Sequence, residues 1–415
     1  MPLPVSIVVV SRHRPAALLR CLAGIAQLDY QNFEVVIVAC PAGQDAVKST
    51  DHAPHLKTIS FDQPNISVAR NLGIAQAAGE VIAFIDDDAV PEPLWLHHLA
   101  APFETGDIAA AGGFVIGRNG ISFQWRARTV DTTGETTPLD VSDTHPTVLQ
   151  PAHDSAIKTE GTNMALRRDV LSGLGGFDPA FHFFLDETDM NMRLAQAGHA
   201  TAIVPLAQVH HGFEASDRRA SDRTPRDLTQ IGASQQAFLR KHCRSAARAP
   251  AWQVFRNGQR NRLLRAMQRG SLDPLDVSRL MRGLDQGARD GLKRSLKETP
   301  SIPRAASEFL AFPGRPGASR HTLTGRIWQA AKLRAEAARS AANGNITTLI
   351  LLDPTARYHR LRFTQDGVWE QTGGLWGRSQ RDAPLLQPWR FARRCDAEQR
   401  RTARVRGPDG FSICE

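Results

Sequence analysis

Short apolar runs alternate with helix-like stretches along the first 115 residues of the chain. The runs at 5–10, 33–39 and 80–85 are rich in Val and Ile, as in strands that are buried on both faces of a sheet. Between them, residues 15–28 and 67–79 carry apolar side chains at helical spacing. This order predicts an α/β fold with a doubly wound, mostly parallel sheet.

A polar stretch interrupts this rhythm at residues 118–158, where Thr, Asp, Gly and Pro break any periodicity. We expect an irregular insertion with short strands there, able to act as a lid. Helical spacing returns at 166–176 and 186–198, each ended by glycine. A strand pattern at 200–212 closes this first unit.

The composition shifts after residue 217. Arg-rich segments at 252–270, 273–296 and 322–344 have helical spacing, whereas 346–353 and 360–372 have strand patterns, the second with a Gln-Asp-Gly hairpin signal. The chain is therefore divided into three predicted parts: an α/β domain at 1–217, a basic helical region at 218–345 and a β-rich C-terminal segment at 346–415.

Composition supports a folded protein with more than one core. The chain has 415 residues, of which 41% are apolar, enough for two ordinary cores and a smaller unit. Its five cysteines are scattered and never spaced as CxxC, which argues against a disulfide framework or a cysteine-rich zinc cluster. No run approaches the roughly 18 apolar residues that span a bilayer. We expect a cytoplasmic protein that is soluble or at most peripheral on the inner face of the membrane.

Charge divides the chain into two halves of opposite sign. The net charge is +9, but residues 1–217 hold 13 Lys and Arg against 25 Asp and Glu, a net −12, and the rest holds 38 against 17, a net +21. The basic half is suited to an anionic membrane surface or an acidic polymer. Nucleic acid is disfavoured because no recognised motif is present. The alternative is a solvated Arg-rich region that packs against the acidic half.

Three consecutive acids, Asp86, Asp87 and Asp88, follow the strand pattern at 80–85. Alternation along an extended chain places Asp86 and Asp88 on one side, where they can share a hard cation such as Mg2+ or Mn2+. The alternative is an acidic turn that caps the next helix. His211, which ends the strand pattern at 200–212, could complete the coordination shell or be an ordinary polar residue at a strand end.

A second group of acids, Asp186, Glu187 and Asp189, stands at the head of the helical pattern at 186–198. One interpretation makes Asp186 a helix cap and Asp189 the partner of Arg193 in a surface pair. Glu187 would then remain free for proton transfer.

Five ordered segments resemble the family 2 glycosyltransferases of the GT-A fold over about residues 4–216. They are "VSIVVVSRHRP", "NISVARNLGIAQAAGEVIAFIDDDAVP", "GTNMALRRDVLSGLGGFD", "DETDMNMRLAQAG" and "VPLAQVHHG". The resemblance implies metal-dependent, inverting transfer of a sugar from a nucleotide-diphosphate donor to a glycan or glycoconjugate acceptor, in surface polysaccharide or glycoconjugate synthesis. It implies a divalent cation, Mn2+ or Mg2+, as cofactor.

Site residues carried over from the resemblance fall into four groups. The nucleotide-sugar group is Ser11, Arg70, Asp86 and Asp87. The metal group is Asp86, Asp88 and His211. The acceptor-side loop is Gly161, Thr162 and Asn163. The catalytic group is Glu187, at the family's base position, with Asp186 and Asp189 beside it.

One departure from the family pattern leaves the donor nucleotide open. In "VIVACPAG", Ala39 or Cys40 stands where the family has an Asp that contacts the base. Two alternative functions follow: a nucleotide-sugar-binding scaffold without turnover, and a nucleotidyltransferase. Against the latter, "SRHRPAA" after the first strand is not a glycine-rich phosphate loop.

Overall fold

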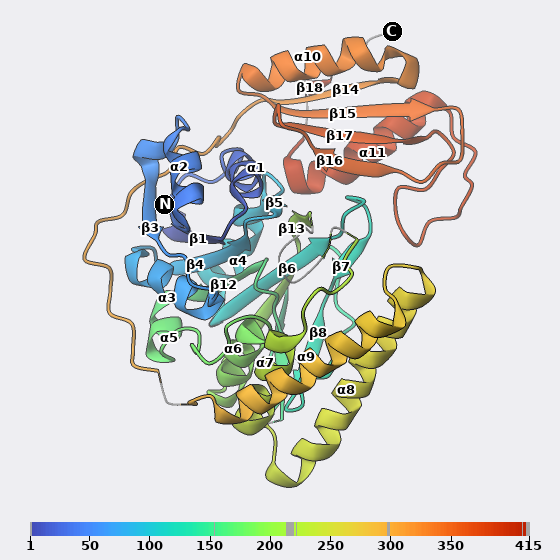
Figure 1. The fold of residues 1–415 in the computed structure, drawn as a ribbon. Coiled ribbons are helices and arrows are strands. Elements are labelled where there is room, and N and C mark those ends of the chain that lie inside the picture. Colours follow the sequence, from blue (N-terminus) through green and yellow to red (C-terminus); the bar gives the residue numbers. More distant parts are fainter. Residues whose placement is uncertain are drawn as a thin grey trace.

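The fold is built on two main sheets with helices around them (Figure 1). The computed structural model describes residues 2–152, 154–212, 220, 222–296, 299–408 and 410–411. A ten-stranded sheet occupies the N-terminal half, and a five-stranded sheet lies near the C-terminus. The predicted α/β class is confirmed.

The first sheet begins with four parallel neighbours in the order β4-β1-β2-β3. Their bounds are β1 Val5–Ser11, β2 Phe33–Ala39, β3 Leu56–Ser60 and β4 Val81–Asp86. The helices between them are α1 Pro15–Ile25, α2 Pro41–Lys48 and α3 Ile66–Gln76. The strands alternate their side chains between two buried faces, with Ile7 packed among α1 and α4 residues and Val8 among residues of α3, α5 and α6. Burial on both faces explains the unbroken apolar runs of the sequence.

The other half of this sheet mixes directions. The full order is β10-β13-β6-β12-β4-β1-β2-β3, with β5 on β13 and β7 on β6. Strands β6 and β13 run with β1 to β4, whereas β5, β7, β10 and β12 run against them. Most strands therefore share one direction, as predicted. The added elements are α4 Trp95–Thr105, α5 Arg168–Gly173, α6 Asp186–Gln196, β5 Ala89–Pro91, β6 Ala110–Ile116, β7 Phe123–Trp125, β10 Thr147–Leu149, β12 Met164–Arg167 and β13 Thr201–His211.

The polar insertion contains short strands, as its composition indicates. It forms a three-stranded sheet in the order β11-β8-β9, built from β8 Arg128–Asp131, β9 Thr136–Pro138 and β11 Ser155–Lys158. Its last strand packs beside α6. The insertion therefore delivers Lys158 to the head of α6, and its role as a lid stays a prediction.

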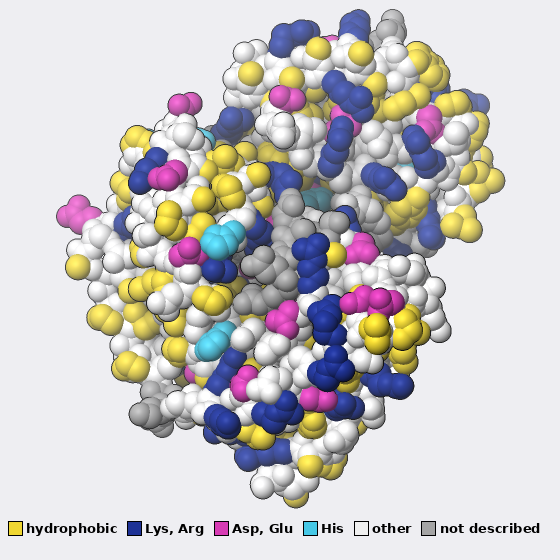
Figure 2. Space-filling view, in the orientation of Figure 1, with side chains coloured by type: hydrophobic (Ala, Val, Ile, Leu, Met, Phe, Trp, Pro, Cys, Tyr) yellow, Lys and Arg dark blue, Asp and Glu magenta, His cyan; other side chains and the backbone are white. Residues whose placement is uncertain are grey.

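Three helices follow the first sheet, α7 Thr229–His242, α8 Ser245–Gln268 and α9 Pro274–Lys293. Their shared core is formed by Leu228, Leu263, Val277, Leu280 and Leu284, among others. Partly buried Trp252, Phe255, Leu264 and Met267 pack against it. These four apolar side chains, which could face lipid in an isolated helix, therefore contribute to the core that the three helices share. Figure 2 shows Lys and Arg side chains spread over the outer surface of this region.

The second sheet has the order β16-β17-β15-β14-β18. Its elements are β14 Arg320–Arg326, α10 Ala330–Ala342, β15 Ile346–Asp353, β16 Arg360–Phe363, β17 Val368–Gly374, α11 Phe391–Arg406 and β18 Gly410–Phe411. Strands β16 and β17 form the predicted hairpin, with Gly367 at φ 74° in its turn. The sheet starts earlier than residue 346, however, because the Thr-rich β14 pairs with β15 in parallel instead of beginning a helix.

Four cysteines of the described ranges, Cys21, Cys40, Cys243 and Cys395, are free and buried. Among the residues that the structure describes, no helix has both the length and the apolar character needed to cross a membrane.

Candidate active site

The acidic triplet lies at the carboxyl edge of the first sheet. Asp86 is the last residue of β4, next to the end of β1. Beyond it the chain turns into β5, which pairs with β13 so that Ala89 is opposite His211. The Gly212 amide donates to the Asp88 carbonyl at 2.7 Å, which fastens the two segments together. Ligands of open α/β sheets bind at this edge.

Asp86, Asp88 and His211 form a candidate metal centre. One ligand atom from each lies within 4.8 Å of the others. His211 Nε2 is 3.2 Å from Asp88 Oδ1 and 4.0 Å from Asp86 Oδ2, while His211 Nδ1 lies 3.2 Å from Gln124 Oε1. Asp88 and His211 are buried, and Asp86 is partly exposed. Two carboxylate oxygens and one imidazole nitrogen fit a hard or borderline divalent cation, with room for further ligands on the exposed side of Asp86.

Asp87 points away from this group, as strand alternation predicts. Its side chain is fully buried, accepts a hydrogen bond from the Ser11 hydroxyl at 2.7 Å, and is ion-paired with Arg14. Burial raises the pKa of Asp87 to about 7, with Asp88 and Asp86 adding to the rise and Arg14 and Ser11 opposing it. Ser11 and Asp87, both assigned to the nucleotide-sugar group, therefore bind each other inside the protein and support Asp88.

Arg70 connects the two acidic groups. It is ion-paired with Asp186, lies 3.4 Å from Asp86 Oδ1, and donates to the Gly161 carbonyl at 3.2 Å. Its guanidinium also lies 5.0 Å from the centroid of the Phe177 ring. A Cβ at Gly161 would come within 2.4 Å of the Arg70 Nη2 atom, so a larger residue there would displace the Arg70 guanidinium.

Asp186 and Glu187 start α6 with different neighbours. Leu185, at φ 65°, precedes them in the strained left-handed region and is the helix cap residue, so Asp186 is not the cap. Burial raises the pKa of Asp186 to about 7. Glu187 adds to this rise, whereas Arg70 opposes it. Burial also disfavours ionised Glu187, but Lys158, with Nζ 2.9 Å away, lowers the pKa of Glu187 to about 2. Glu187 is therefore paired, not free as we expected.

Asp189 lies in a buried ion cluster. It is 2.8 Å from Arg193 Nε, Lys241 Nζ and His242 Nε2, with no exposed side-chain surface. Burial opposes ionisation, yet Arg193, His242 and Lys241 together lower the pKa of Asp189 well below its usual range. The expected pair with Arg193 is present, but it is not on the surface, because α7 covers it. Asp189 therefore fastens α7 to α6 and points away from the other acids of the catalytic group.

Residues of the loop assigned to the acceptor side point in different directions. Asn163 is buried, accepts from Trp95 Nε1 at 2.7 Å, and donates to the Phe114 and Ala207 carbonyls at 3.0 and 2.8 Å. These contacts use its amide inside the core. Gly161 contacts Arg70, and Thr162 is buried. The loop is thus held by Asn163 and faces the site through Gly161.

Part of the C-terminal unit clamps the segment that follows the acidic triplet. Arg406 of α11 donates to both carboxylate oxygens of Glu92 at 2.7 and 2.8 Å, and His210 Nε2 is 2.7 Å from the same carboxylate. The Trp369 ring covers the Arg406 guanidinium at 4.5 Å. Glu92, Arg406 and Trp369 are buried. Since His210 precedes His211 in β13, these contacts support the strand that carries the histidine of the metal centre.

Sequence reasoning missed Lys158, Arg14 and Arg406 as members or supports of the site. Lys158 ends a short insertion strand, and Arg406 lies far along the chain, so no local spacing marks either residue. Arg14 could have been predicted, because it follows β1, and residues that follow β1 and β4 lie at the same edge of the sheet.

Comparison with protein families gives one match, to the model described as glycosyltransferase like family 2, over residues 2–228. That range covers more than half of the chain and contains both acidic groups.

Curated relatives match about half of the chain. The O-antigen biosynthesis protein RfbC of Myxococcus xanthus is 28% identical over 239 residues, which are 52% of this chain and 18% of that protein. The uncharacterized glycosyltransferase YwdF of Bacillus subtilis is 25% identical over 57% of this chain and 81% of its own length. The pre-mycofactocin glycosyltransferase of Mycobacterium tuberculosis is 24% identical over 50% of this chain and 42% of its own length. The chain thus spans less than half of the first and third of these relatives.

Solved structures with similar chain traces include GalNAc-T7 with UDP, GalNAc and Mn2+, at a TM-score of 0.41 and 17% identity over 58% of this chain and 48% of that one. A mannosyltransferase of Pyrobaculum calidifontis with GDP-Man and Mn2+ has a TM-score of 0.40 and 14% identity over 71% of this chain and 88% of its own.

Proposed function

The chain belongs to the glycosyltransferase-like family 2, and we propose that it transfers a sugar from a nucleotide-diphosphate donor to an acceptor hydroxyl with the help of a divalent cation. The observation that carries the proposal is the convergence of Asp86, Asp88 and His211 at the carboxyl edge of the sheet. Nearby, a second pair of acids is available to take up a proton.

The donor set of the proposed metal centre is suited to Mn2+ or Mg2+, since oxygen atoms predominate. When bound, such a cation neutralises negative charge on a leaving nucleotide diphosphate. Asp88 and His211 are held by buried contacts, so the group is organised before a ligand arrives. Arg14 and Arg70 add positive charge on either side of the acidic triplet.

Asp186 and Glu187 act as the proton acceptor in this proposal. A general base works best when its pKa is near the working pH, and Asp186, with a pKa raised to about 7, meets that condition. Lys158 keeps Glu187 ionised, so the pair holds one proton at most near neutral pH. The acceptor hydroxyl would lose its proton to this pair while its oxygen attacks the sugar. The family register favours Glu187 as the residue that touches the hydroxyl, and the pKa difference favours Asp186.

We include inversion at the anomeric carbon in the proposal, because a single displacement needs only a base on the acceptor side. A two-step mechanism would require a separate carboxylate as nucleophile. The buried contacts of Asp189 and Asp87 make those two acids poor candidates for that role.

Surface polysaccharide or glycoconjugate synthesis is the proposed setting. Support comes from the Myxococcus xanthus relative, which is named for O-antigen biosynthesis. The basic charge of residues 218–415 supports, in addition, a cytoplasmic protein that binds an anionic membrane surface peripherally. Flotation with anionic vesicles tests that association, and absence from the vesicles at low salt would contradict it.

Incubation of the full-length protein with a panel of nucleotide sugars tests the activity. Nucleotide release would be measured with candidate acceptors, with Mn2+ or with chelator. We expect release from one donor, and loss of that release on chelation. Binding without release from any donor would instead favour a nucleotide-sugar-binding scaffold, and pyrophosphate formation from a sugar phosphate and a nucleoside triphosphate would favour a nucleotidyltransferase.

A further inference from the structure

Three neighbouring strands of the first sheet end at the same level. Ser11 of β1 is opposite Ala39 of β2, and Ala39 is opposite Ser60 of β3. The residues just beyond these ends include His13, Cys40 and Asp62. Because the strands are parallel and in register, the three exits bring one nitrogen, one sulfur and one oxygen ligand to a single place.

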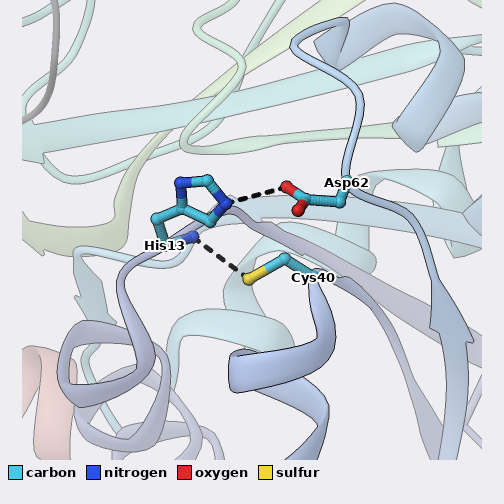
Figure 3. A group of neighbouring side chains, drawn as sticks. All are labelled: His13, Cys40 and Asp62. Carbon is cyan, nitrogen blue, oxygen red and sulfur yellow. Dashed lines mark hydrogen bonds and ion pairs between the residues drawn. The ribbon is translucent and has the colours of Figure 1, made fainter.

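The three side chains face one another (Figure 3). One ligand atom of each lies within 4.8 Å of the other two, and His13 Nε2 is 2.9 Å from Asp62 Oδ1. Cys40 is buried, whereas the His13 and Asp62 side chains are 51% and 44% exposed. The cluster therefore has a sulfur at its base and an open side toward solvent.

Two features of the backbone hold this arrangement. His13 has φ 58°, a left-handed conformation that histidine adopts more readily than most residues. Its backbone amide donates to Cys40 Sγ at 3.2 Å. An amide that donates to sulfur is the kind of outer contact that orients a thiolate ligand. The exposed His13–Asp62 ion pair contributes little stability by itself, so stability does not account for the convergence.

We propose that His13, Cys40 and Asp62 bind a borderline-soft divalent cation, Zn2+ in the first place, with an open coordination position toward solvent. Sulfur, imidazole nitrogen and one carboxylate oxygen suit Zn2+. Zinc sites that keep one coordination position open have three protein ligands. The oxygen-rich group of Asp86, Asp88 and His211 prefers a harder ion. The same edge of the sheet would thus carry two cation sites of different chemistry.

Binding exchanges protons for the metal. The Cys40 thiol releases one proton to solvent, and the proton through which His13 Nε2 contacts Asp62 moves to solvent or to Nδ1 so that Nε2 can coordinate. Arg12 stands beside the site, with Nε 2.9 Å from Asp62 Oδ1, and competes for that carboxylate. Cysteine spacing gave no sign of the cluster, since its members come from three separate strand ends.

Cobalt titration of the metal-free, full-length protein tests the site without any sugar donor. We expect equimolar Co2+ to produce a near-ultraviolet thiolate-to-cobalt charge-transfer band that Zn2+ removes. Cys40→Ser should abolish the band. His13→Ala should weaken cobalt binding at least about tenfold, and thermal unfolding checks that the variant still folds with alanine in the left-handed conformation of this exposed position. Cys243→Ser, which alters a buried cysteine elsewhere, and Asp88→Asn should leave the band unchanged.

Absence of the band at equimolar cobalt in the wild-type protein would overturn the proposal. So would a band that survives in Cys40→Ser, or unchanged cobalt affinity in a folded His13→Ala variant. Because the readout is direct metal binding in the absence of donor, failure here is separate from failure of the proposed transferase activity.

Discussion

Two groups of buried acids lie near each other in this protein and are neutralised in different ways. Asp186, Glu187 and Asp189 are paired with side chains of the protein itself: Arg70, Lys158, Arg193, Lys241 and His242. Asp87 and Asp88 lie beside Arg14, Asp86 lies beside Arg70, and the His211 ring contacts Asp88. The first group is balanced by the fold itself. We propose that the second group is completed by an external cation at the exposed side of Asp86.

Asp88→Asn should give the largest effect, because it removes a proposed ligand of the divalent cation. We expect transfer to fall at least about a thousandfold, which corresponds to about 4 kcal/mol of transition-state stabilisation. Thermal unfolding should be little changed, since repulsion within the triplet is relieved. Asp51→Asn, at an exposed position, is the control. A folded Asp88→Asn enzyme with near-normal turnover would break the comparison.

Arg406→Met extends the comparison to another buried acid, Glu92, whose ion-pair partner Arg406 comes from the C-terminal unit. Although burial opposes ionisation, Arg406 and His210 lower the pKa of Glu92 to about 2. The variant leaves that carboxylate without its main partner, so we expect a loss of about 3 kcal/mol of unfolding free energy and weaker Mn2+ binding.

Two companion variants make the Arg406 result interpretable. Arg404→Met changes an exposed arginine on the same helix and should have no effect. Combining Arg406→Met with Glu92→Gln should recover most of the stability, since the buried charge is removed. Unfolding in urea, and Mn2+ titration below the unfolding transition, provide the measurements. Equal stability of wild type and Arg406→Met would show that the clamp contributes nothing.

Asp189→Asn tests whether the second group is structural at this position. We expect a loss of about 3 kcal/mol in unfolding free energy at neutral pH, because Arg193, Lys241 and His242 lose their shared carboxylate. Since the folded-state pKa of Asp189 is depressed, its stabilisation is present above the ordinary value of about 4 and is lost as the pH falls below it. The difference between wild type and variant should therefore shrink in acid. A constant difference from neutral to acidic pH would contradict this assignment.

The pH dependence of transfer should show the smallest of these effects. Asp186 must be unprotonated to accept a proton, and its pKa is raised to about 7, so turnover should rise with pH and level off above about 7. Lys158→Met removes the cation beside Glu187 and should move this limb upward by about one pH unit. Lys48→Met, an exposed control, should leave it in place. If turnover did not change between about pH 5 and pH 8, Asp186 would be excluded as the base.

Local pattern and sheet topology were sufficient to predict much of this site. Apolar runs predicted β1, β2 and β4, and the rule that ligands bind at carboxyl edges placed Asp86 and Asp88 at the site. The end of a strand pattern and the family resemblance added His211, which the structure places beside them. The partners of the second group were not predictable in the same way. Lys158, Lys241 and Arg406 reach the site from distant elements, and their contacts depend on tertiary packing that periodicity does not encode.

Helix α6 shows why burial was misjudged. Its sequence is polar on most sides, which is typical of a surface helix, yet Asp189 is fully buried because α7 supplies Lys241 and His242 as partners. A similar effect hides β14, whose Thr-rich pattern becomes a strand only through pairing with β15. Both errors arise where a distant element, not the local sequence, decides the environment.

Direct binding of Mn2+ is the measurement that tests the central claim most closely. The electron paramagnetic resonance signal of free Mn2+ would be followed as wild type, Asp88→Asn and Glu187→Gln are added. We predict that wild type and Glu187→Gln bind the ion, whereas Asp88→Asn binds it at least about tenfold more weakly. Equal Mn2+ affinity of wild type and Asp88→Asn would contradict the claim that the first acidic group is completed by an external cation.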